Sequence, residues 1–497
     1  MNLAAIIEPH PADAVAIVSR GRPTTYGMLR EQVAHLRGGL SSLGLVPGDR
    51  VAIVAANNWY FVASYLAILG AGCVAVPLNP TSPARELQDQ VAAVGARAMV
   101  VGPSGASAVR GIDRSRVPTL EHLVAADSST LDGAVSIDDL LAAETAPLVD
   151  RSADDVAVLV FTSGTAGAPR AAMLTHGNLR ANIDQCQGLE ARAQGPDDVV
   201  LGVLPFFHIF GLNVVLGLSL MAGASVVLVE RFDPQTALES IATHGVTVIS
   251  GAPTMWAAWA TLPGTRPGAF ATVRLAASGA ARLDPHVQRT MHERFGVDLV
   301  EGYGLTEASP VVTTGSGIAA PEGSIGVPVP DLRVRLVEPD GQDALVGDPG
   351  EIWVSGPNVF VGYWQDEEAT RRAIDEDGWL HTGDVAVVDD DGHLFLVDRI
   401  KDLIIVSGFN VYPAEVEEVI AEHPGVEEVA VVGVPHPHSG EAIKAYVVAR
   451  PGASLEEDDL IAHCEARLAR YKCPQKVMFV DEIPHSATGK TRRAALR

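Results

Sequence analysis

Apolar and polar positions alternate in blocks along the first hundred residues. Six blocks follow one another, each helix-like or strand-like in its periodicity: helix-like Tyr26–Leu43, strand-like RVAIVAA (50–56), helix-like FVASYLAILGAG (61–72), strand-like CVAVPL (73–78), helix-like Ser82–Val94 and strand-like ARAMVV (96–101). Strands that alternate with helices of this length form right-handed βαβ units around a largely parallel sheet. The pattern therefore predicts an α/β fold.

A second alternating series follows further along the chain. Its strand-like runs, separated by helix-like segments, are VVLGVLP (199–205), ASVVLV (224–229), GVTVIS (245–250), TVRLAAS (272–278) and VDLVEG (297–302). Residues 103–150 between the two series are rich in Ser, Asp and Ala and only weakly periodic, which predicts a connector.

After about residue 323 the pattern changes from alternating helices and strands to mostly strands. The runs RVRLVE (333–338), GEIWVSG (350–356) and GHLFLVD (392–398) are strand-like, and Asp-Gly turns punctuate them. After Lys401 a smaller strand and helix alternation begins and is long enough for a domain. The chain is thus expected to have a large N-terminal domain of βαβ subdomains with a β-rich subdomain, and a small C-terminal α/β domain.

The longest apolar run, 210–229, approaches the length of a membrane span. Asn213 interrupts it, and Ala222-Gly223-Ala224 divides it into a helix-like and a β-branched piece. We therefore expect a buried helix–strand pair and no transmembrane segment, and peripheral membrane contact is left open. The N-terminus has no basic region of the kind that opens a signal peptide, so a cytoplasmic location is expected.

Composition narrows the functional class. The chain has 497 residues, 47% of them hydrophobic, and a formal net charge of −25, which argues against nucleic acid as a partner. The four cysteines (Cys73, Cys186, Cys464 and Cys473) contain no C-x-x-C pair, which fits reduced thiols rather than a metal or disulfide framework.

The stretch FTSGTAGAPR (161–170) follows an apolar strand and could bind phosphate. Its glycines allow backbone N–H groups to converge on an anion, its hydroxyls add donors, and its arginine could clamp phosphate oxygens. The residues concerned are Thr162, Ser163, Gly164, Thr165, Gly167 and Arg170. The alternative is a solvated connector, because short glycine motifs occur by chance.

EGYGLTE (301–307) closes another strand-like run. Gly302 and Gly304 would let a flat ligand approach the backbone, Tyr303 offers a ring for stacking, and Glu307 could bind Mg²⁺. The alternative is a turn in which Thr306 caps a helix.

The remaining candidates are single residues whose alternatives are ordinary structural roles. Asp384, in WLHTGD (379–384), is placed past a turn and could accept hydrogen bonds from a ribose diol. His208, in PFFHIFG (205–211), is either a packed core residue or a functional one. Arg399 and Lys401 lie in a charged segment that could be only a linker.

IPHSATGKTRR (483–493) imitates the end of a Walker A motif. Pro484 stands where that motif needs glycine, so the P-loop interpretation fails. The segment is either a basic tail or a mobile loop that carries Lys490 into a site.

The order of these motifs is more specific than any one of them. T-S-G-T, P-x-x-H, S-G-A, Y-G-x-T-E, T-G-D, D-R-x-K-D and P-x-x-x-x-G-K follow one another over essentially the whole chain. In this the chain resembles the adenylate-forming superfamily of acyl-CoA synthetases, luciferase-like enzymes and peptide-synthetase adenylation domains, and most closely a fatty acyl-CoA ligase.

The resemblance implies an N-terminal AMP-binding domain over 1–397, a hinge over 398–401 and a mobile C-terminal lid over 402–497. It implies that the 162–167 loop holds pyrophosphate, with Thr162 and Glu307 near Mg²⁺. It implies the following further roles: Ser278, Gly279 and Ala280 along the adenine or acyl group, Tyr303 on the adenine, Thr306 on the α-phosphate, Asp384 and Arg399 on the ribose, Lys401 at the hinge, Gly408 along the coenzyme A tunnel, His208 at the thiol entry and Lys490 on the carboxylate and α-phosphate.

The activity implied is ATP-dependent conversion of a carboxylic acid to acyl-AMP and then to acyl-CoA, with ATP, Mg²⁺ and coenzyme A. The segments expected to line the acyl pocket, 206–217 and 303–312, contain no basic residue, which favours a medium- or long-chain fatty acid. The alternatives are an aryl-CoA ligase, an acyl-AMP ligase that loads a carrier protein and a catalytically silent acyl or nucleotide binder. The phosphate loop departs from the family pattern at Ala166, Arg170 and Ala171, where Thr, Lys and Gly are usual.

Overall fold

The structure is a computed structural model that describes residues 1–162, 170–189, 193–318, 320–399, 402, 404–406, 409–436, 440–468, 470–486 and 490–496. The chain divides into two compact units. The first comprises Met1–Ala319, Pro328–Arg333 and Ser355–Leu380, and the second comprises Ala320–Val327, Val334–Val354 and His381–Arg497. The predicted domain boundaries around 398–401 stay a prediction.

The first sheet of the first unit is seven-stranded, with the order β7-β6-β5-β3-β4-β8-β9. Adjacent strands in this sheet are parallel, except for β8 and β9, which form an antiparallel hairpin. Its strands are β3 (Arg50–Val54), β4 (Val74–Leu78), β5 (Ala98–Val101), β6 (His122–Ala125), β7 (Val135–Ser136), β8 (Val156–Thr162) and β9 (Arg170–Thr175).

The second sheet has nine strands in the order β16-β15-β14-β13-β12-β10-β11-β1-β2. Strands β1, β11, β10, β12, β13 and β14 are parallel, whereas β2 and β15 run antiparallel to their neighbours. The strands are β1 (Val15–Ser19), β2 (Arg22–Thr25), β10 (Val199–Gly202), β11 (Ser225–Leu228), β12 (Val248–Gly251), β13 (Leu275–Ser278), β14 (Leu299–Gly304), β15 (Val311–Thr314) and β16 (Val327–Pro328).

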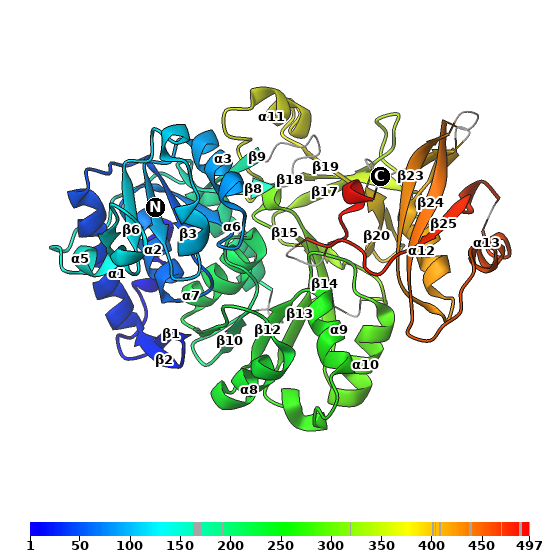
Figure 1. Ribbon diagram of the computed structural model, residues 1–497, viewed down its shortest axis with the longest axis horizontal. Helices are drawn as coiled ribbons and strands as arrows, with labels where there is room; N and C mark the ends of the chain where they lie inside the picture. The colour runs from blue at the N-terminus through cyan, green and yellow to red at the C-terminus, as the bar shows by residue number, and fades with distance from the viewer. Residues whose placement is uncertain are drawn as a thin grey trace. The chain divides into compact units, whose positions relative to one another are not determined.

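Helices connect the parallel strands, as the alternating pattern predicts (Figure 1). They are α1 (Tyr26–Ser42), α2 (Trp59–Gly70), α3 (Ala84–Val94), α4 (Ala106–Arg110), α5 (Ile137–Leu141), α6 (His176–Gln187), α7 (Leu218–Ala222), α8 (Pro234–His244), α9 (Pro253–Thr261), α10 (Pro285–Phe295) and α11 (Glu367–Ala373). The predicted α/β fold class is confirmed.

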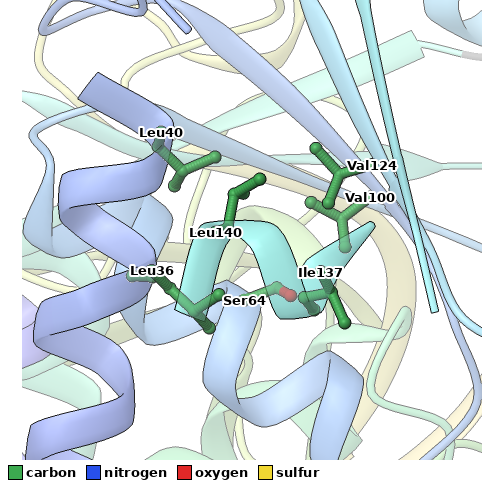
Figure 2. A pocket seen from close by; sticks show the side chains of 8 residues that line it. Leu36, Leu40, Ser64, Val100, Val124, Ile137 and Leu140 are labelled. Atoms are coloured by element: carbon green, nitrogen blue, oxygen red, sulfur yellow. The ribbon is translucent and has the colours of Figure 1, made fainter. Parts of the chain in front are cut away.

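The prediction of a connector over 103–150 is wrong for residues 122–141. Strands β6 and β7 extend the first sheet, and α5 packs on α1 so closely that a Cβ on Gly39 would lie 2.6 Å from the side chain of Leu140. Figure 2 shows Ile137 and Leu140 of α5 facing Leu36 and Leu40 of α1 around a small, mainly apolar core cavity. These elements are too short to produce a clear period. Pairing with β5 stabilises β6 and through it β7, and packing against α1 stabilises α5.

The apolar run 210–229 forms the expected helix–strand pair. A π-helix (Phe210–Gly217) continues into α7, and β11 follows. Among the described residues, no helix has both the length and the apolar character needed to cross a membrane. All four cysteines are buried, and none of them forms a disulfide in the structure.

The second unit contains two smaller sheets (Figure 1). One has the order β17-β18-β19-β20, and the other has the order β22-β21-β24-β23, with β25 paired to β24. The elements are β17 (Arg333–Val337), β18 (Gly350–Ser355), β19 (Leu380–Val388), β20 (Leu394–Arg399), β21 (Ile404–Val406), β22 (Phe409–Val411), α12 (Pro413–Ala421), β23 (Val426–His436), β24 (Gly440–Ala449), α13 (Glu457–Glu465) and β25 (Lys476–Phe479). Pro413 opens α12, where its missing N–H costs nothing.

The N-terminal segment of the first unit is held by a buried histidine. The Nδ1 atom of His176 accepts a hydrogen bond of 3.1 Å from the backbone N–H of Leu3. Burial, assisted by the positive charge of Arg151, lowers the pKa of His176 from 6.5 to about 4. The native ring therefore stays neutral at pH values where the unfolded chain is already protonated.

We expect the free energy of unfolding to decrease as the pH falls from 6.5 towards 4, by about 3 kcal/mol at the full effect. Urea unfolding at several pH values measures this slope. His176→Gln should flatten it, whereas His286→Gln, which changes an exposed histidine, should retain it. Equal slopes in the wild type and His176→Gln would contradict the assignment.

Candidate active site

The turn that carries Thr306 and Glu307 lies directly after β14. It is a short 3₁₀ helix (Thr306–Ala308). The N-cap position belongs to Leu305, whose side chain makes no capping hydrogen bond, so Thr306 is not the capping residue. The Tyr363 hydroxyl donates a hydrogen bond of 2.7 Å to Oε1 of Glu307, and the backbone N–H of Phe360 donates one of 2.8 Å to the Glu307 carbonyl. Segment 357–366 thus orients the carboxylate that was predicted to bind metal.

Buried side-chain amides hold the same turn from the other direction. The Asn358 amide donates to the Ala308 carbonyl at 2.7 Å, and the Asn213 amide donates to the Ser309 carbonyl at 2.7 Å. Asn182 exchanges two hydrogen bonds with the backbone of Val311, at 2.9 and 3.0 Å. Because buried polar groups are costly to leave unpaired, these amides restrict the turn to one conformation.

Sequence reasoning missed these amides and Tyr363. For Asn213 a signal existed, since an amide inside an apolar run is expensive unless it is hydrogen-bonded. Asn182, Asn358 and Tyr363 stand in segments whose patterns do not distinguish them from ordinary surface positions.

The end of the β8–β9 hairpin lies in the same neighbourhood, because β9 pairs through its backbone with segment 361–364. Arg170, at the start of β9, donates from Nε to Oδ2 of Asp366 at 3.0 Å, and its guanidinium lies 5.9 Å from the Tyr363 ring centroid. The Thr162 hydroxyl donates to the Arg170 carbonyl at 3.5 Å. The predicted residues Ser163, Gly164, Thr165 and Gly167, with the departure Ala166, lie outside the described residues.

The departure at Ala171 is accommodated without strain. Its side chain is buried in β9 opposite Phe161, and its carbonyl accepts a hydrogen bond of 2.8 Å from the N–H of Trp364. A methyl group is therefore part of the packing at this position.

The carboxyl ends of β12, β13 and β14 bring together a second group of predicted residues. Ser278 lies in register between Gly251 and Glu301, and its buried hydroxyl has no hydrogen-bond partner within the part of the chain that the structure describes. Gly279 follows it, and a Cβ there would lie 3.1 Å from the ring of Phe210. Ala280 has a φ of 72°, a left-handed conformation that is uncommon for a residue with a side chain.

The packing of the chain requires glycine at positions 302 and 304, independently of any ligand. A Cβ at Gly302 would lie 2.9 Å from the Thr313 carbonyl oxygen, and one at Gly304 would lie 2.2 Å from that of Pro310. Strand β15 therefore passes too close for any other residue at these two positions. Tyr303, between them, pairs with Thr313 and is largely buried.

His208 precedes the π-helix. Its Nδ1 atom accepts a hydrogen bond of 3.3 Å from the Phe210 N–H, and its own backbone bonds to Pro205 and Leu212. The histidine is thus fixed beside the ring that lies on Gly279.

Glu301 is a buried carboxyl group that sequence reasoning did not single out. Its Oε2 accepts a hydrogen bond of 3.1 Å from the Leu283 N–H, which ties β14 to the segment after Ala280. Burial raises the pKa of Glu301 from 4.5 to about 7, against the opposing effects of the Leu283 N–H and Arg282.

Asp384, Arg399 and Lys490 belong to the second unit. Asp384 lies inside β19 opposite Arg399 of β20, and it is buried, so the prediction that it lies past a turn is wrong. The residues Thr382 and Gly383 that suggested a turn form part of the same strand, with Gly383 at a φ of 71°. Lys401 and Gly408 lie outside the described residues.

The donors present fit Mg²⁺. No group of three or more His, Cys, Asp or Glu side chains that could hold a metal occurs within the described ranges. Mg²⁺ does not require one, because it keeps several waters and binds one or two carboxylates together with substrate phosphates. The oriented Glu307 carboxylate could serve as a ligand of that kind.

Comparison with known proteins identifies the family. The sequence pattern of the AMP-binding enzyme family matches residues 4–364, and that of its C-terminal domain matches residues 415–490. The chain belongs to the AMP-binding enzyme family. The predicted superfamily and the prediction of a ligase are confirmed, and ATP, Mg²⁺ and coenzyme A are the small molecules of the ATP-dependent CoA ligases in this family.

The relatives have different acid substrates in their names. A feruloyl-CoA synthase of Amycolatopsis sp is 39% identical over 99% of this chain and 96% of its own length. A long-chain-fatty-acid–CoA ligase of Yersinia pestis is 37% identical over 98% of this chain and 92% of its own. Among solved structures, ATP-bound MatB of Rhodopseudomonas palustris superposes with a TM-score of 0.92 at 33% identity, covering 100% of this chain and 98% of its own.

We expect Tyr363→Phe to raise the Mg²⁺ concentration needed for half-maximal ATP–pyrophosphate exchange by about tenfold, because a hydrogen bond to a charged carboxylate is lost. Tyr26→Phe is the control, since its hydroxyl bonds to the Ala224 carbonyl at 2.8 Å, away from this turn. Tyr26→Phe should lower the melting temperature without altering the Mg²⁺ dependence. An unchanged Mg²⁺ dependence in Tyr363→Phe would show that Tyr363 does not orient Glu307.

Glu301→Gln tests the buried carboxyl. The native state keeps the Glu301 proton up to about pH 7, whereas the unfolded chain loses it above 4.5. The stabilisation that protonated Glu301 contributes to the free energy of unfolding is therefore lost as the pH rises from 4.5 through 7, by about 3 kcal/mol in total.

The variant should accordingly gain stability relative to the wild type between pH 5 and pH 8 in urea titrations. Glu293→Gln, at an exposed position on α10, should show no such trend. A constant difference between Glu301→Gln and the wild type would refute the shifted pKa.

Proposed function

We propose that this enzyme activates an apolar monocarboxylic acid in two steps. The carboxylate oxygen attacks the α-phosphorus of ATP, and pyrophosphate leaves to give acyl-AMP. The thiolate of coenzyme A then attacks the acyl carbonyl carbon, and AMP leaves with the bonding electrons to give acyl-CoA. The observation that carries the proposal is the Glu307 carboxylate, fixed by Tyr363 on a turn that buried amides hold rigid.

The first step brings two anions together, so positioning and charge neutralisation matter more than a general base. When bound, Mg²⁺ would neutralise phosphate charge beside Glu307 and Thr162. Thr306 would contact the α-phosphate, Lys490 would bridge it to the carboxylate, and the phosphate loop up to Arg170 would hold the departing pyrophosphate.

Residues of several motifs would bind the nucleoside. Tyr303 would stack on the adenine above Gly302 and Gly304, with Ser278, Gly279 and Ala280 alongside. Asp384, assisted by Arg399, would accept hydrogen bonds from the ribose hydroxyls. His208 would stand at the thiol entry, Gly408 along the coenzyme A tunnel, and Lys401 at the hinge of a lid over 402–497.

A medium- or long-chain fatty acid is the first candidate for the acid. Segment 206–217 is mostly buried and mostly apolar, and Phe206, Ile209 and Leu212 are at most 1% exposed. Neither this segment nor 303–312 contains Lys or Arg, so a second carboxylate on the substrate would have no partner from them.

An aryl carboxylate is the second candidate, and the Phe210 ring is the specific observation that favours it. The Phe210 ring lies close to Gly279, where it would offer an aromatic surface beside the expected acyl group. The 39% identity to a feruloyl-CoA synthase supports the same alternative. The proposed location is cytoplasmic for either candidate.

A panel of carboxylates tests the substrate class. Purified enzyme with ATP, Mg²⁺ and coenzyme A is offered fatty acids from short to long, hydroxycinnamates, benzoates, dicarboxylates and amino acids, and thioesters are identified by mass spectrometry. We expect apolar monocarboxylates to react and dicarboxylates and amino acids to fail. Reaction of aromatic acids alone would replace the first candidate with the second.

Acyl-AMP that accumulates without thioester would instead indicate a ligase that loads a carrier protein. Absence of ATP–pyrophosphate exchange with every acid would identify a silent binder and overturn the proposal.

A further inference from the structure

A largely buried ion cluster ties the end of the chain to the beginning of the small α/β part of the second unit. Arg493 bonds bidentately to Glu417 of α12, from Nη2 to Oε2 at 2.7 Å and from Nε to Oε1 at 3.2 Å. Its Nη1 lies 3.6 Å from Oδ2 of Asp402. The side chains of Arg493, Glu417 and Asp402 are only 16%, 17% and 14% exposed.

Glu417 is itself held in place. Its Oε1 accepts a hydrogen bond of 2.7 Å from the backbone N–H of Val431 in β23, so the carboxylate faces the guanidinium with little freedom. Fork-to-fork pairing of arginine with carboxylate is directional as well as strong. The cluster is therefore a joint of defined geometry rather than a loose surface contact.

The members of the cluster lie at chemically significant points of the chain. Asp402 directly follows the proposed hinge over 398–401, and Arg493 comes three residues after Lys490. The cluster thus connects the residue next to the hinge with the segment that carries the proposed catalytic lysine.

Backbone pairing extends this rigidity from Arg493 to Lys490. The Lys490 N–H donates to the Ser486 hydroxyl at 3.1 Å, and the Lys490 carbonyl accepts from the Ser486 N–H at 2.8 Å. The Arg492 N–H donates to the Pro484 carbonyl at 2.8 Å, and His485 pairs with Thr491. The chain beyond Arg493 is anchored by the Tyr446 hydroxyl, which donates to the Leu496 carbonyl at 2.7 Å.

We infer that Arg493 is a positioning residue for Lys490, because its ion pairs with Asp402 and Glu417 make the lysine segment move as one body with the residue that follows the hinge. The inference rests on the proposed function, in which Lys490 serves the adenylation step. Rotation about 398–401 would then carry Lys490 with its geometry intact. A loose lysine would lose rate, since small misplacements of a reacting group are costly.

The half-reactions separate this role from a purely structural one. Adenylation, measured as ATP–pyrophosphate exchange, depends on Lys490, whereas thioester formation from supplied acyl-AMP does not. Arg493→Gln should lower the exchange rate by about tenfold to 100-fold and leave thioester formation within about twofold of the wild type. Arg493→Lys keeps the positive charge but not the two-pronged guanidinium, so its exchange rate should lie between those of the wild type and Arg493→Gln.

Lys472→Gln is the matched control. Lys472 forms an ion pair of 2.5 Å with Glu415, which lies on α12 as Glu417 does. The control should leave both half-reactions within about twofold of the wild type. Comparable melting temperatures of the control and Arg493→Lys verify that folding is retained.

The possible outcomes separate the positioning role of Arg493 from the proposed role of Lys490 in adenylation. Lys490→Ala with normal exchange would overturn the proposed role of Lys490 itself. Lys490→Ala without exchange, together with normal exchange in both Arg493 variants, would overturn only the positioning role. Equal loss of both half-reactions in Arg493→Lys would show that the cluster serves stability alone and would overturn the inference as well.

Discussion

The satisfaction of buried backbone groups after β14 is the constraint on which the site of the first unit depends. Between Leu305 and Pro310 the chain leaves the sheet ladder, and its carbonyl groups need other partners. Asn358 and Asn213 supply them to Ala308 and Ser309. These amides come from the π-helix and from the segment near 358, so the packing of distant elements determines where Thr306 and Glu307 stand.

Charge is the second constraint. A protein with a net charge of −25 repels ATP and carboxylates at long range, so local groups must reverse the sign of the potential. Two arginines next to the proposed site residues are paired with the protein's own carboxylates, Arg170 with Asp366 and Arg493 with Glu417. Such pairing orients a guanidinium before the substrate arrives, which is how preorganised charge lowers a barrier.

The periodicity of the chain predicted most of the βαβ alternation, because parallel strands and amphipathic helices each require a regular spacing of apolar residues. It failed for β6, β7 and α5, which are short and become stable only against α1 and β5. It also misplaced Asp384, whose Thr-Gly-Asp sequence is typical of a turn but which is buried inside β19. In both cases tertiary packing overrode a weak local preference.

The sequence by itself determined the fold class, the family and the kinds of group available for chemistry. Each motif, such as those that contain Tyr303, Glu307 and Lys490, is a short unbroken stretch that can be recognised without the fold. Only the tertiary structure decided how those groups are held. Tyr363 meets Glu307 across 56 residues, and Arg493 meets Glu417 across 76. Periodicity reports on neighbours within one helix or strand, whereas a hydrogen bond between distant segments depends on how the whole chain packs.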